Sequence, residues 1–206
     1  MSDAIDELID TLEQDAKSAT SSSDSPDVGI IMGSDSDLEI MAGAYEALTQ
    51  LGFEEITKES DTAQAPYTFE TYVVSAHRTP DLMYAYANTA ADRGIDVIIA
   101  GAGGKSADLP NMTASIAFPI PVIGVPVQEK SVNSVIGMPT GAPITAVDAG
   151  KSFNAALSAI QILARSDEEL TSRLRSYHNE LRQSVGEISR ELNDSGTPAF
   201  RSRSDR

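Results

Sequence analysis

The sequence has 206 residues and a formal net charge of −16, from 31 acidic and 15 basic side chains. This length supports one sizeable domain with additions, and a hydrophobic content of 41% is ordinary for a chain that buries a core. The charge argues against nucleic-acid binding, because phosphate contacts need a basic face. A chain without cysteine has no disulfides and no thiolate metal ligands. With no signal peptide and no apolar run near the roughly 18–20 residues of a membrane span, a cytoplasmic location is expected.

The acidity has two interpretations. It can mark a surface that faces a partner, or it can be a solubility adaptation to high salt, where screening removes the self-repulsion. Acidic residues are spread along the chain rather than grouped in blocks. This distribution favours a halophile-like, high-salt cytoplasm.

Residues 1–26 are predicted to be an acidic extension outside the main domain. Apolar residues recur at helical spacing on an otherwise acidic segment, at Ile5, Leu8, Ile9, Leu12 and Ala16. Residues 18–26 are rich in serine and have the composition of a linker. We therefore expect a short helix on a flexible tether.

Residues 27–165 show strands that alternate with helices. The first unit has an apolar strand at 28–32, a polar turn at 33–37 with a capping-box spacing at Ser36 and Glu39, and a helix that ends at Gly52. Further strands are predicted at 72–75, 95–100, 121–125 and 144–147, and helices at 80–93, after Pro110 and at 151–165. This alternation predicts an α/β domain, with a parallel sheet covered by helices on both faces.

Residues 166–206 are predicted to be a carboxy-terminal amphipathic helix followed by a disordered tail over the last dozen residues. A capping-box spacing at Ser166 and Glu169 opens the segment. Apolar residues then recur every three or four positions, at Leu170, Leu174, Tyr177, Leu181, Val185, Ile188 and Leu192. Such a stripe needs a partner surface, either on its own domain or on a neighbouring subunit.

Four loops leave the carboxyl ends of the predicted strands, at 33–37, 75–79, 101–106 and 126–143. In a parallel sheet these loops lie along one edge, where ligands bind. His77, one of only two histidines, lies in the second loop beside Arg78. A lone histidine is more often structural than chemical, so its neighbours decide its role.

The first and third of these loops have both a structural and a ligand-binding interpretation. The turn Gly33-Ser-Asp-Ser-Asp37 opens a helix, which favours an anion, although simple helix capping explains it as well. The run Gly101-Ala-Gly-Gly-Lys-Ser106 fails the Walker A pattern at Ile99 and the dinucleotide fingerprint at Ser106. What remains is a tight turn or a loop whose backbone approaches a ligand closely.

Other common chemistries are poorly supported by the sequence. Two histidines and no cysteine give little from which to build a metal site, so no metal is predicted. A Ser-His-Asp hydrolase would need a Gly-x-Ser-x-Gly elbow, which this chain lacks. His178 lies in the carboxy-terminal helix and is expected at a surface or an interface.

Five motifs together resemble one known family. They are Gly33-Ser-Asp-Ser-Asp37, Val73-Val-Ser-Ala-His-Arg-Thr-Pro-Asp81, Ile99-Ala-Gly-Ala-Gly-Gly104, Met138-Pro-Thr-Gly-Ala-Pro143 and Asn154-Ala-Ala-Leu-Ser-Ala-Ile-Gln-Ile-Leu163. In this order they are similar to the N5-carboxyaminoimidazole ribonucleotide mutases, the catalytic subunits of phosphoribosylaminoimidazole carboxylase in purine biosynthesis. The resemblance covers about residues 27–165.

The resemblance implies a flavodoxin-like three-layer fold and a homo-octamer whose carboxy-terminal helices reach neighbouring subunits. It also implies an isomerase that uses no cofactor and moves a carbamate carboxylate from nitrogen to the adjacent imidazole carbon, with carbon dioxide as a transient. Carried onto this chain, it makes His77 the catalytic acid and base. The matching substrate-binding positions are Ser34, Asp37 and Arg78, with Gly33, Ser36, Ser75, Gly103, Gly104 and Lys105 as further candidates.

The chain departs from the family pattern in two places. Asp108 stands where bacterial members usually have a histidine, and this stretch of the chain is one residue longer than theirs. Leu38 stands where they usually have tryptophan. A second class of the family carboxylates aminoimidazole ribonucleotide directly, as a lyase, and typically has a Gly-Arg-Ser-Asn loop; Gly103-Gly-Lys-Ser106 matches neither form. The run Gly124-Val-Pro-Val127 favours the mutase. Direct carboxylation, or a non-catalytic nucleotide-binding module of the same fold, remains the alternative.

Overall fold

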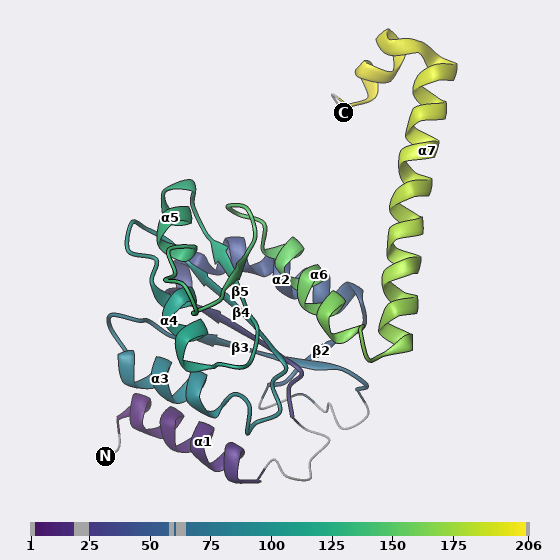
Figure 1. Ribbon diagram of the computed structural model, residues 1–206. Coiled ribbons are helices and arrows are strands. Elements are labelled where there is room, and N and C mark those ends of the chain that lie inside the picture. Colours follow the sequence, from purple (N-terminus) through teal and green to yellow (C-terminus); the bar gives the residue numbers. More distant parts are fainter. Residues whose placement is uncertain (1–2, 19–24, 58–59, 61–64, 205–206) are drawn as a thin grey trace. The chain divides into compact units, whose positions relative to one another are not determined.

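The computed structural model describes residues 3–18, 25–57, 60 and 65–204 (Figure 1). The chain divides into two compact units, Met1–Leu163 and Ala164–Arg206. In the described part of the chain, no helix combines the length and the apolar character that crossing a membrane requires. Each unit is described on its own.

The first unit is built from short parallel strands and the helices that connect them. Its strands are β1 (Val28–Met32), β2 (Glu54–Glu55), β3 (Thr68–Val73), β4 (Val97–Ala102), β5 (Val122–Pro126) and β6 (Thr145–Ala146). Its α-helices are α1 (Ala4–Ser18), α2 (Leu38–Gln50), α3 (Pro80–Thr89), α4 (Leu109–Ile116), α5 (Val132–Val135) and α6 (Ser152–Leu163). Two 3-10 turns, η2 (Asp35–Asp37) and η3 (Glu129–Ser131), follow β1 and β5.

The six strands form one sheet in the order β2-β3-β1-β4-β5-β6, and every pairing is parallel. Without the two-residue edge strand β2, this is the 2-1-3-4-5 order of flavodoxin-like sheets. β1 lies at the centre, where Ile30 pairs with Thr71 on one side and with Ile99 on the other. The chain therefore reverses direction across the sheet after β3, and β1 and β4 flank the point of reversal.

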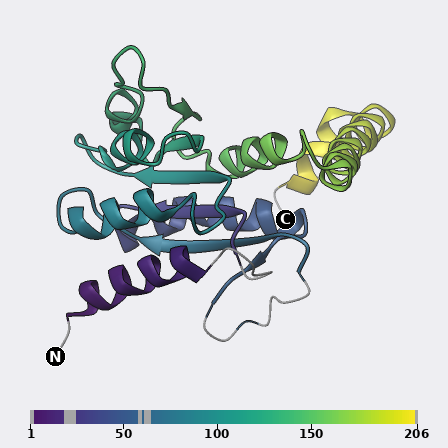
Figure 2. The same ribbon diagram turned by 60° about the horizontal axis from the view of Figure 1, so that its bottom comes forward.

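Helices cover both faces of the sheet (Figure 2), which confirms the three-layer prediction. α2 packs with α6 on one face, where a Cβ atom at Gly101 of β4 would collide with Met41 of α2. α3 packs with α4 on the other, where a Cβ atom at Gly29 of β1 would collide with the Tyr86 hydroxyl of α3. The two glycines let the helices approach the strands closely.

The strand predicted at 72–75 is displaced in the structure, where β3 runs from Thr68 to Val73. The prediction followed the apolar run and overlooked Glu70, which is buried within the strand. Glu70 accepts a hydrogen bond from Arg93 Nη1 at 2.6 Å, and the Arg93 guanidinium lies 4.7 Å from the centre of the Tyr86 ring. Because the charge is paired, a carboxylate can occupy an interior strand position.

The helix of the 1–26 extension is part of the core of the first unit. α1 packs against α3, and Leu12 is fully buried in the apolar cluster that also contains Leu82 and Tyr86. Ile5 and Ile9 pack against the same cluster. The tether predicted at 18–26 falls largely on 19–24, which lie outside the described residues.

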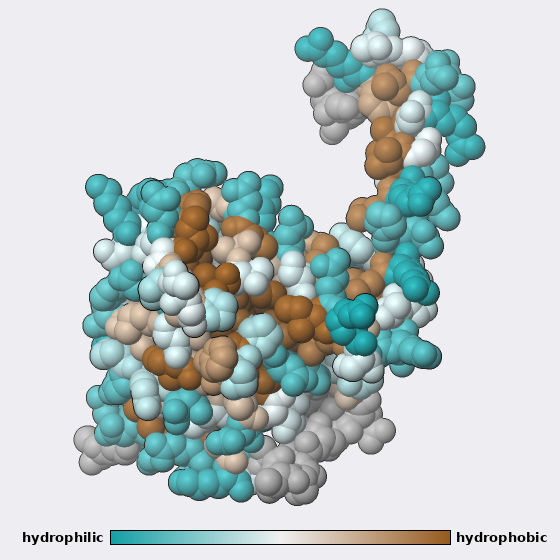
Figure 3. All heavy atoms as spheres, in the orientation of Figure 1, coloured by the Kyte–Doolittle hydropathy of each residue, from teal (hydrophilic) through white to brown (hydrophobic). Residues whose placement is uncertain are grey.

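The second unit contains α7 (Glu168–Ser204). The side chain of Asp167 accepts the Leu170 backbone N–H at 2.9 Å at the first turn of the helix. The helix continues beyond residue 195, where the sequence led us to expect disorder, although Gly196 interrupts it with non-helical dihedral angles (φ 77°, ψ 156°). Exposed apolar residues follow one stripe, which Figure 3 shows in brown along the helix, at Leu181, Val185, Ile188 and Leu192.

Candidate active site

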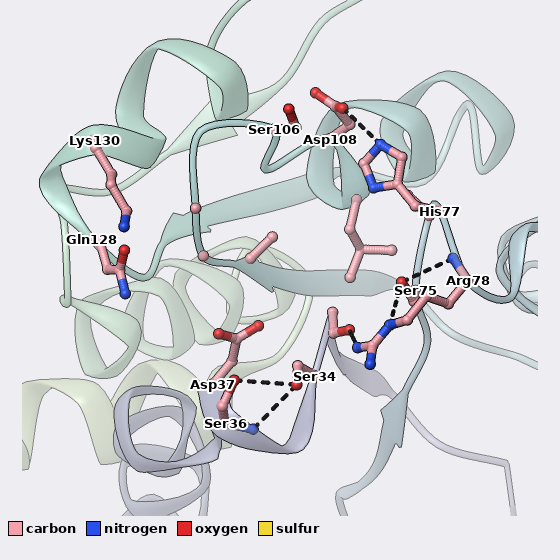
Figure 4. A pocket seen from close by; sticks show the side chains of 16 residues that line it. Ser34, Ser36, Asp37, Ser75, His77, Arg78, Ser106, Asp108, Gln128 and Lys130 are labelled. Carbon is pink, nitrogen blue, oxygen red and sulfur yellow. Dashed lines mark hydrogen bonds and ion pairs between the residues drawn. The ribbon is translucent and has the colours of Figure 1, made fainter.

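A cavity of about 310 Å³ opens at the carboxyl ends of the central strands (Figure 4). The loops after β1, β3, β4 and β5 all contribute to it, as the parallel topology predicts. Its lining residues are Gly33, Ser34, Ser36, Asp37, Ser75, Ala76, His77, Arg78, Ala102, Gly103, Gly104, Ser106, Asp108, Leu109, Gln128 and Lys130.

The loop after β1 is ordered by its own serine side chains. The Ser36 backbone N–H donates to Ser34 Oγ at 3.4 Å, so Ser34 caps the η2 turn. The Ser36 hydroxyl also donates to Ser34 Oγ, at 3.1 Å. The expected capping box at Ser36 and Glu39 is therefore replaced by a cap two residues earlier, which turns both hydroxyls toward the cavity (Figure 4).

Asp37 is the one buried carboxylate among the lining residues, with 7% of its surface exposed. Burial raises the pKa of its carboxyl above the ordinary value of 3.8, while backbone hydrogen bonds from Ser34 and Gly103 and the charge of Arg78 act in the opposite direction. A Cβ atom at Gly103 would lie only 3.0 Å from Asp37 Oδ1, so glycine lets the two loops meet. A buried carboxylate with free acceptor capacity suits the hydroxyl groups of a ribose.

Arg78 joins the loop after β3 to the loop after β1. Its Nη2 donates to the Gly33 carbonyl oxygen at 2.9 Å, and its Nε and backbone N–H donate to Ser75 Oγ at 3.4 and 3.2 Å. The Ser75 backbone N–H donates in turn to Thr79 Oγ1 at 2.9 Å, just before α3. These contacts hold the guanidinium at the cavity wall with other N–H groups available to an anion.

His77 directly precedes Arg78 in the loop after β3, and its side chain contacts Asp108 of the loop after β4. Its Nε2 lies 3.2 Å from Asp108 Oδ2, and Asp108 Oδ1 accepts a hydrogen bond from the Ser134 hydroxyl at 2.7 Å. The His77 side chain is 60% exposed, so a substrate can reach the ring. Imidazole is the side chain best suited to take up and return a proton near neutral pH.

The glycine-rich loop after β4 brings backbone close to the cavity. Gly104 has a positive φ of 88°, and its carbonyl oxygen accepts a hydrogen bond from Ser131 Oγ at 2.8 Å. Lys105, one of the further candidates, is exposed and is not among the lining residues found in the described chain. Lys130 and Gln128 from the loop after β5 line the cavity instead (Figure 4).

The site shows no arrangement typical of a bound metal. Within the described residues, no three histidine, aspartate or glutamate side chains gather as metal ligands do. The groups present are a histidine, an arginine, a lysine, two carboxylates and small hydroxyl-bearing residues. This set can bind a phosphorylated, hydroxylated ligand and can transfer a proton to or from it.

Comparison with known proteins agrees with the resemblance drawn from the motifs. A sequence profile of the AIR carboxylase family matches residues 27–184. The chain belongs to the AIR carboxylase family. Its first unit, from Asp27 onward, and part of α7 lie within the match, whereas α1 precedes it.

Curated relatives in this family are similar over most of their length. The N5-carboxyaminoimidazole ribonucleotide mutase of Pyrococcus horikoshii is 42% identical over 180 residues, which cover 84% of this chain and 93% of the relative. The mutase of Bacillus subtilis is 47% identical over 175 residues, covering 81% and 98%. Among solved structures, Treponema denticola PurE matches with a TM-score of 0.65 and 23% identity over 80% of this chain and 97% of that one, which supports the fold.

The structure brings together nearly all residues that the sequence assigned to the site. His77, Arg78, Ser34 and Asp37 line one cavity, with Gly33, Ser36, Ser75, Gly103 and Gly104. Sequence reasoning missed Lys130 and Gln128, although it placed their loop at this edge. It noted Asp108 as a departure from the family pattern without giving it a role.

Proposed function

We propose that this chain is an N5-carboxyaminoimidazole ribonucleotide mutase, an isomerase of purine biosynthesis. Relatives with this name are 41–48% identical over most of the chain. The observation that carries the proposal is the cavity, because it gathers an exposed imidazole, an anchored guanidinium, a buried carboxylate and a glycine-rich loop. Each of these groups matches one requirement of the reaction.

The reaction needs one proton to be delivered and one to be removed. The bond between the carbamate carbon and the exocyclic nitrogen breaks, carbon dioxide leaves, and the nitrogen takes a proton from the His77 imidazolium. The adjacent imidazole carbon then attacks carbon dioxide and forms the new carbon–carbon bond. The proton on that carbon returns to His77, so the enzyme ends in its starting state and 4-carboxy-5-aminoimidazole ribonucleotide is released.

The remaining cavity residues bind the nucleotide and its transient. The Arg78 guanidinium and the Ser34 hydroxyl bind the phosphate, because a fork of N–H donors suits phosphate oxygens. Asp37 accepts hydrogen bonds from the ribose hydroxyls, and the backbone of Gly103 and Gly104 surrounds the free carbon dioxide. The loop after β5 limits the entry of water while carbon dioxide is free.

We also propose that the enzyme is a homo-oligomer, with the octamer of the family as the expected form. The exposed stripe of α7, at Leu181, Val185, Ile188 and Leu192, supports this, since an amphipathic helix is stable when its apolar face is covered. A second copy of the chain is the occupant proposed for this stripe.

Replacement of His77 tests the catalytic proposal directly. We expect His77→Asn to lower kcat by on the order of 10² to 10⁴-fold, the usual contribution of a general acid–base group, without loss of substrate binding. His178→Asn is the matched control, because it removes the other histidine and should retain parental turnover. If His77→Asn turns over at the parental rate, the acid–base role is wrong and a binding module of the same fold is favoured.

A further inference from the structure

Asp108 occupies the N-cap position of α4, but its side chain does not cap the helix. It directly precedes α4, where an aspartate side chain commonly accepts the first backbone N–H groups of the helix. In the described structure its carboxylate makes no such capping hydrogen bond. Both oxygens contact other residues, Oδ2 with His77 Nε2 at 3.2 Å and Oδ1 with the Ser134 hydroxyl at 2.7 Å.

We propose that Asp108 is a positioning residue for His77, which fixes the ring so that Nδ1 is the atom that exchanges protons with the substrate. This inference rests on the proposed catalytic role of His77. An ionised carboxylate only accepts hydrogen bonds, whereas a neutral imidazole carries one N–H and one lone pair. A neutral His77 that keeps this contact therefore carries its hydrogen on Nε2 and presents the lone pair on Nδ1.

The second ring nitrogen is free for this task. Among the described residues, Nδ1 of His77 has no hydrogen-bond partner. Figure 4 shows it on the side of the ring away from Asp108 and toward the cavity. When Nδ1 takes the proton from the substrate carbon, the resulting imidazolium faces the Asp108 carboxylate, which is complementary to its charge.

The position of Asp108 is itself fixed by α5. Ser134, the third residue of α5, donates its hydroxyl to Asp108 Oδ1, and its carbonyl oxygen accepts a hydrogen bond from Asn111 Nδ2 of α4 at 2.9 Å. The Asp108 side chain is 35% exposed, and that of His77 is more exposed still. An exposed imidazole has few packing contacts to hold it, so this chain of hydrogen bonds supplies the orientation that proton transfer requires.

The tautomer of His77 provides a test that does not depend on activity. The 206-residue sequence contains two histidines, so a protein labelled with ¹⁵N-histidine gives two sets of ring signals, and His178→Gln assigns them. For neutral His77 we expect the Nε2–H tautomer in the parent protein. Asp108→Asn should remove this preference, because an amide can either donate or accept.

Kinetics of variants test the consequence for turnover. We expect Asp108→Ala to lower kcat by on the order of 10²-fold with little change in KM, as small misplacement of a catalytic group does. Ser134→Ala should change kcat in the same direction by less, and Asp108→Glu should recover part of the loss. Asp81→Asn is the matched control, because Asp81 lies near His77 in sequence but its carboxylate accepts only the Leu82 backbone N–H in the described structure.

The two proposals fail in different ways. Parental kcat in a folded Asp108→Ala protein, or an unchanged tautomer in Asp108→Asn, overturns the positioning role even if His77→Asn is inactive. Full turnover in His77→Asn instead overturns the catalytic proposal, and the tautomer experiment still reports whether Asp108 orients the ring. Thermal unfolding of each variant identifies one that fails to fold, in which case Asp108→Asn and Ser134→Ala carry the test.

Discussion

At the scale of single residues, Asp37 is a buried carboxylate in the wall of the cavity. Burial raises the pKa of its carboxyl, so ionisation at neutral pH opposes folding. For such a group, the favourable contribution to stability is complete below the unfolded pKa and is lost as the pH rises through the raised folded pKa. This cost to stability is consistent with the proposed role of Asp37 in binding the substrate.

Asp37→Asn should therefore weaken substrate binding without destabilising the protein at neutral pH. We expect KM to rise, and the free energy of unfolding at pH 7 to equal or exceed that of the parent. The difference in stability should shrink as the pH falls toward 4, because the parental carboxyl then becomes protonated. Urea unfolding at both pH values measures it, and a variant less stable than the parent only at pH 7 would contradict the assignment.

Two lysines near the glycine-rich loop should differ in importance. Both side chains are exposed, but among the described residues that line the cavity only Lys130 is present. We expect Lys130→Ala to raise KM about tenfold, as the loss of one charged contact of roughly 1.5 kcal/mol does. Lys105→Ala serves as the control and should change KM by no more than about twofold, because Lys105 is not among the lining residues of the cavity and an exposed charge outside it contributes little. Equal effects of the two changes would show that the loop binds substrate in another arrangement.

At the scale of elements, α1 is part of the hydrophobic core although it lies before the family match. Leu12 is fully buried. We expect Leu12→Ala to lower the free energy of unfolding by about 2–5 kcal/mol, the usual effect of truncating a buried leucine. Leu8→Ala, at a position that is 37% exposed, should have a much smaller effect in the same urea titration. Equal stability of the parent and Leu12→Ala proteins would mean that α1 contributes little to the core, as expected of an extension outside the main domain.

The three central strands β1, β4 and β5 follow closely from the sequence because every one of their residues is buried. The strand at 28–32 is predicted to the residue, since every position is apolar or glycine, Asp27 precedes it and a polar turn that begins at Gly33 follows it. The parallel order then places the loops at one edge and predicts the convergence of Ser34, Asp37, His77 and Arg78. For these residues, local pattern and topology are sufficient.

What the sequence does not reveal depends on contacts between distant segments. β3 was misplaced because its buried Glu70 is paired with Arg93, which lies 23 residues away. The contact of Asp108 with His77 likewise joins loops after different strands, and its support comes from Ser134 on a third element. Such pairs have no local sequence signal, because a charged or polar residue on its own does not show which distant residue it contacts.

At the scale of the whole molecule, α7 is expected to hold subunits together. Its apolar stripe at Leu181, Val185, Ile188 and Leu192 is exposed within the described chain. Deletion of residues 166–206 should lower the number of subunits per particle measured by light scattering. Val185→Glu should weaken assembly in the same direction, since it places a charge in the stripe. An unchanged subunit number in both proteins would show that the helix packs within its own subunit.

The central claim is that the chain is a mutase and not a direct carboxylase, and isotopic labelling tests it most directly. The purified protein is given N5-carboxyaminoimidazole ribonucleotide with ¹³C in the carbamate carbon, in unlabelled bicarbonate. We predict rapid formation of 4-carboxy-5-aminoimidazole ribonucleotide that retains ¹³C, because carbon dioxide is held between the two steps. Product that forms efficiently only from aminoimidazole ribonucleotide and bicarbonate would contradict the account.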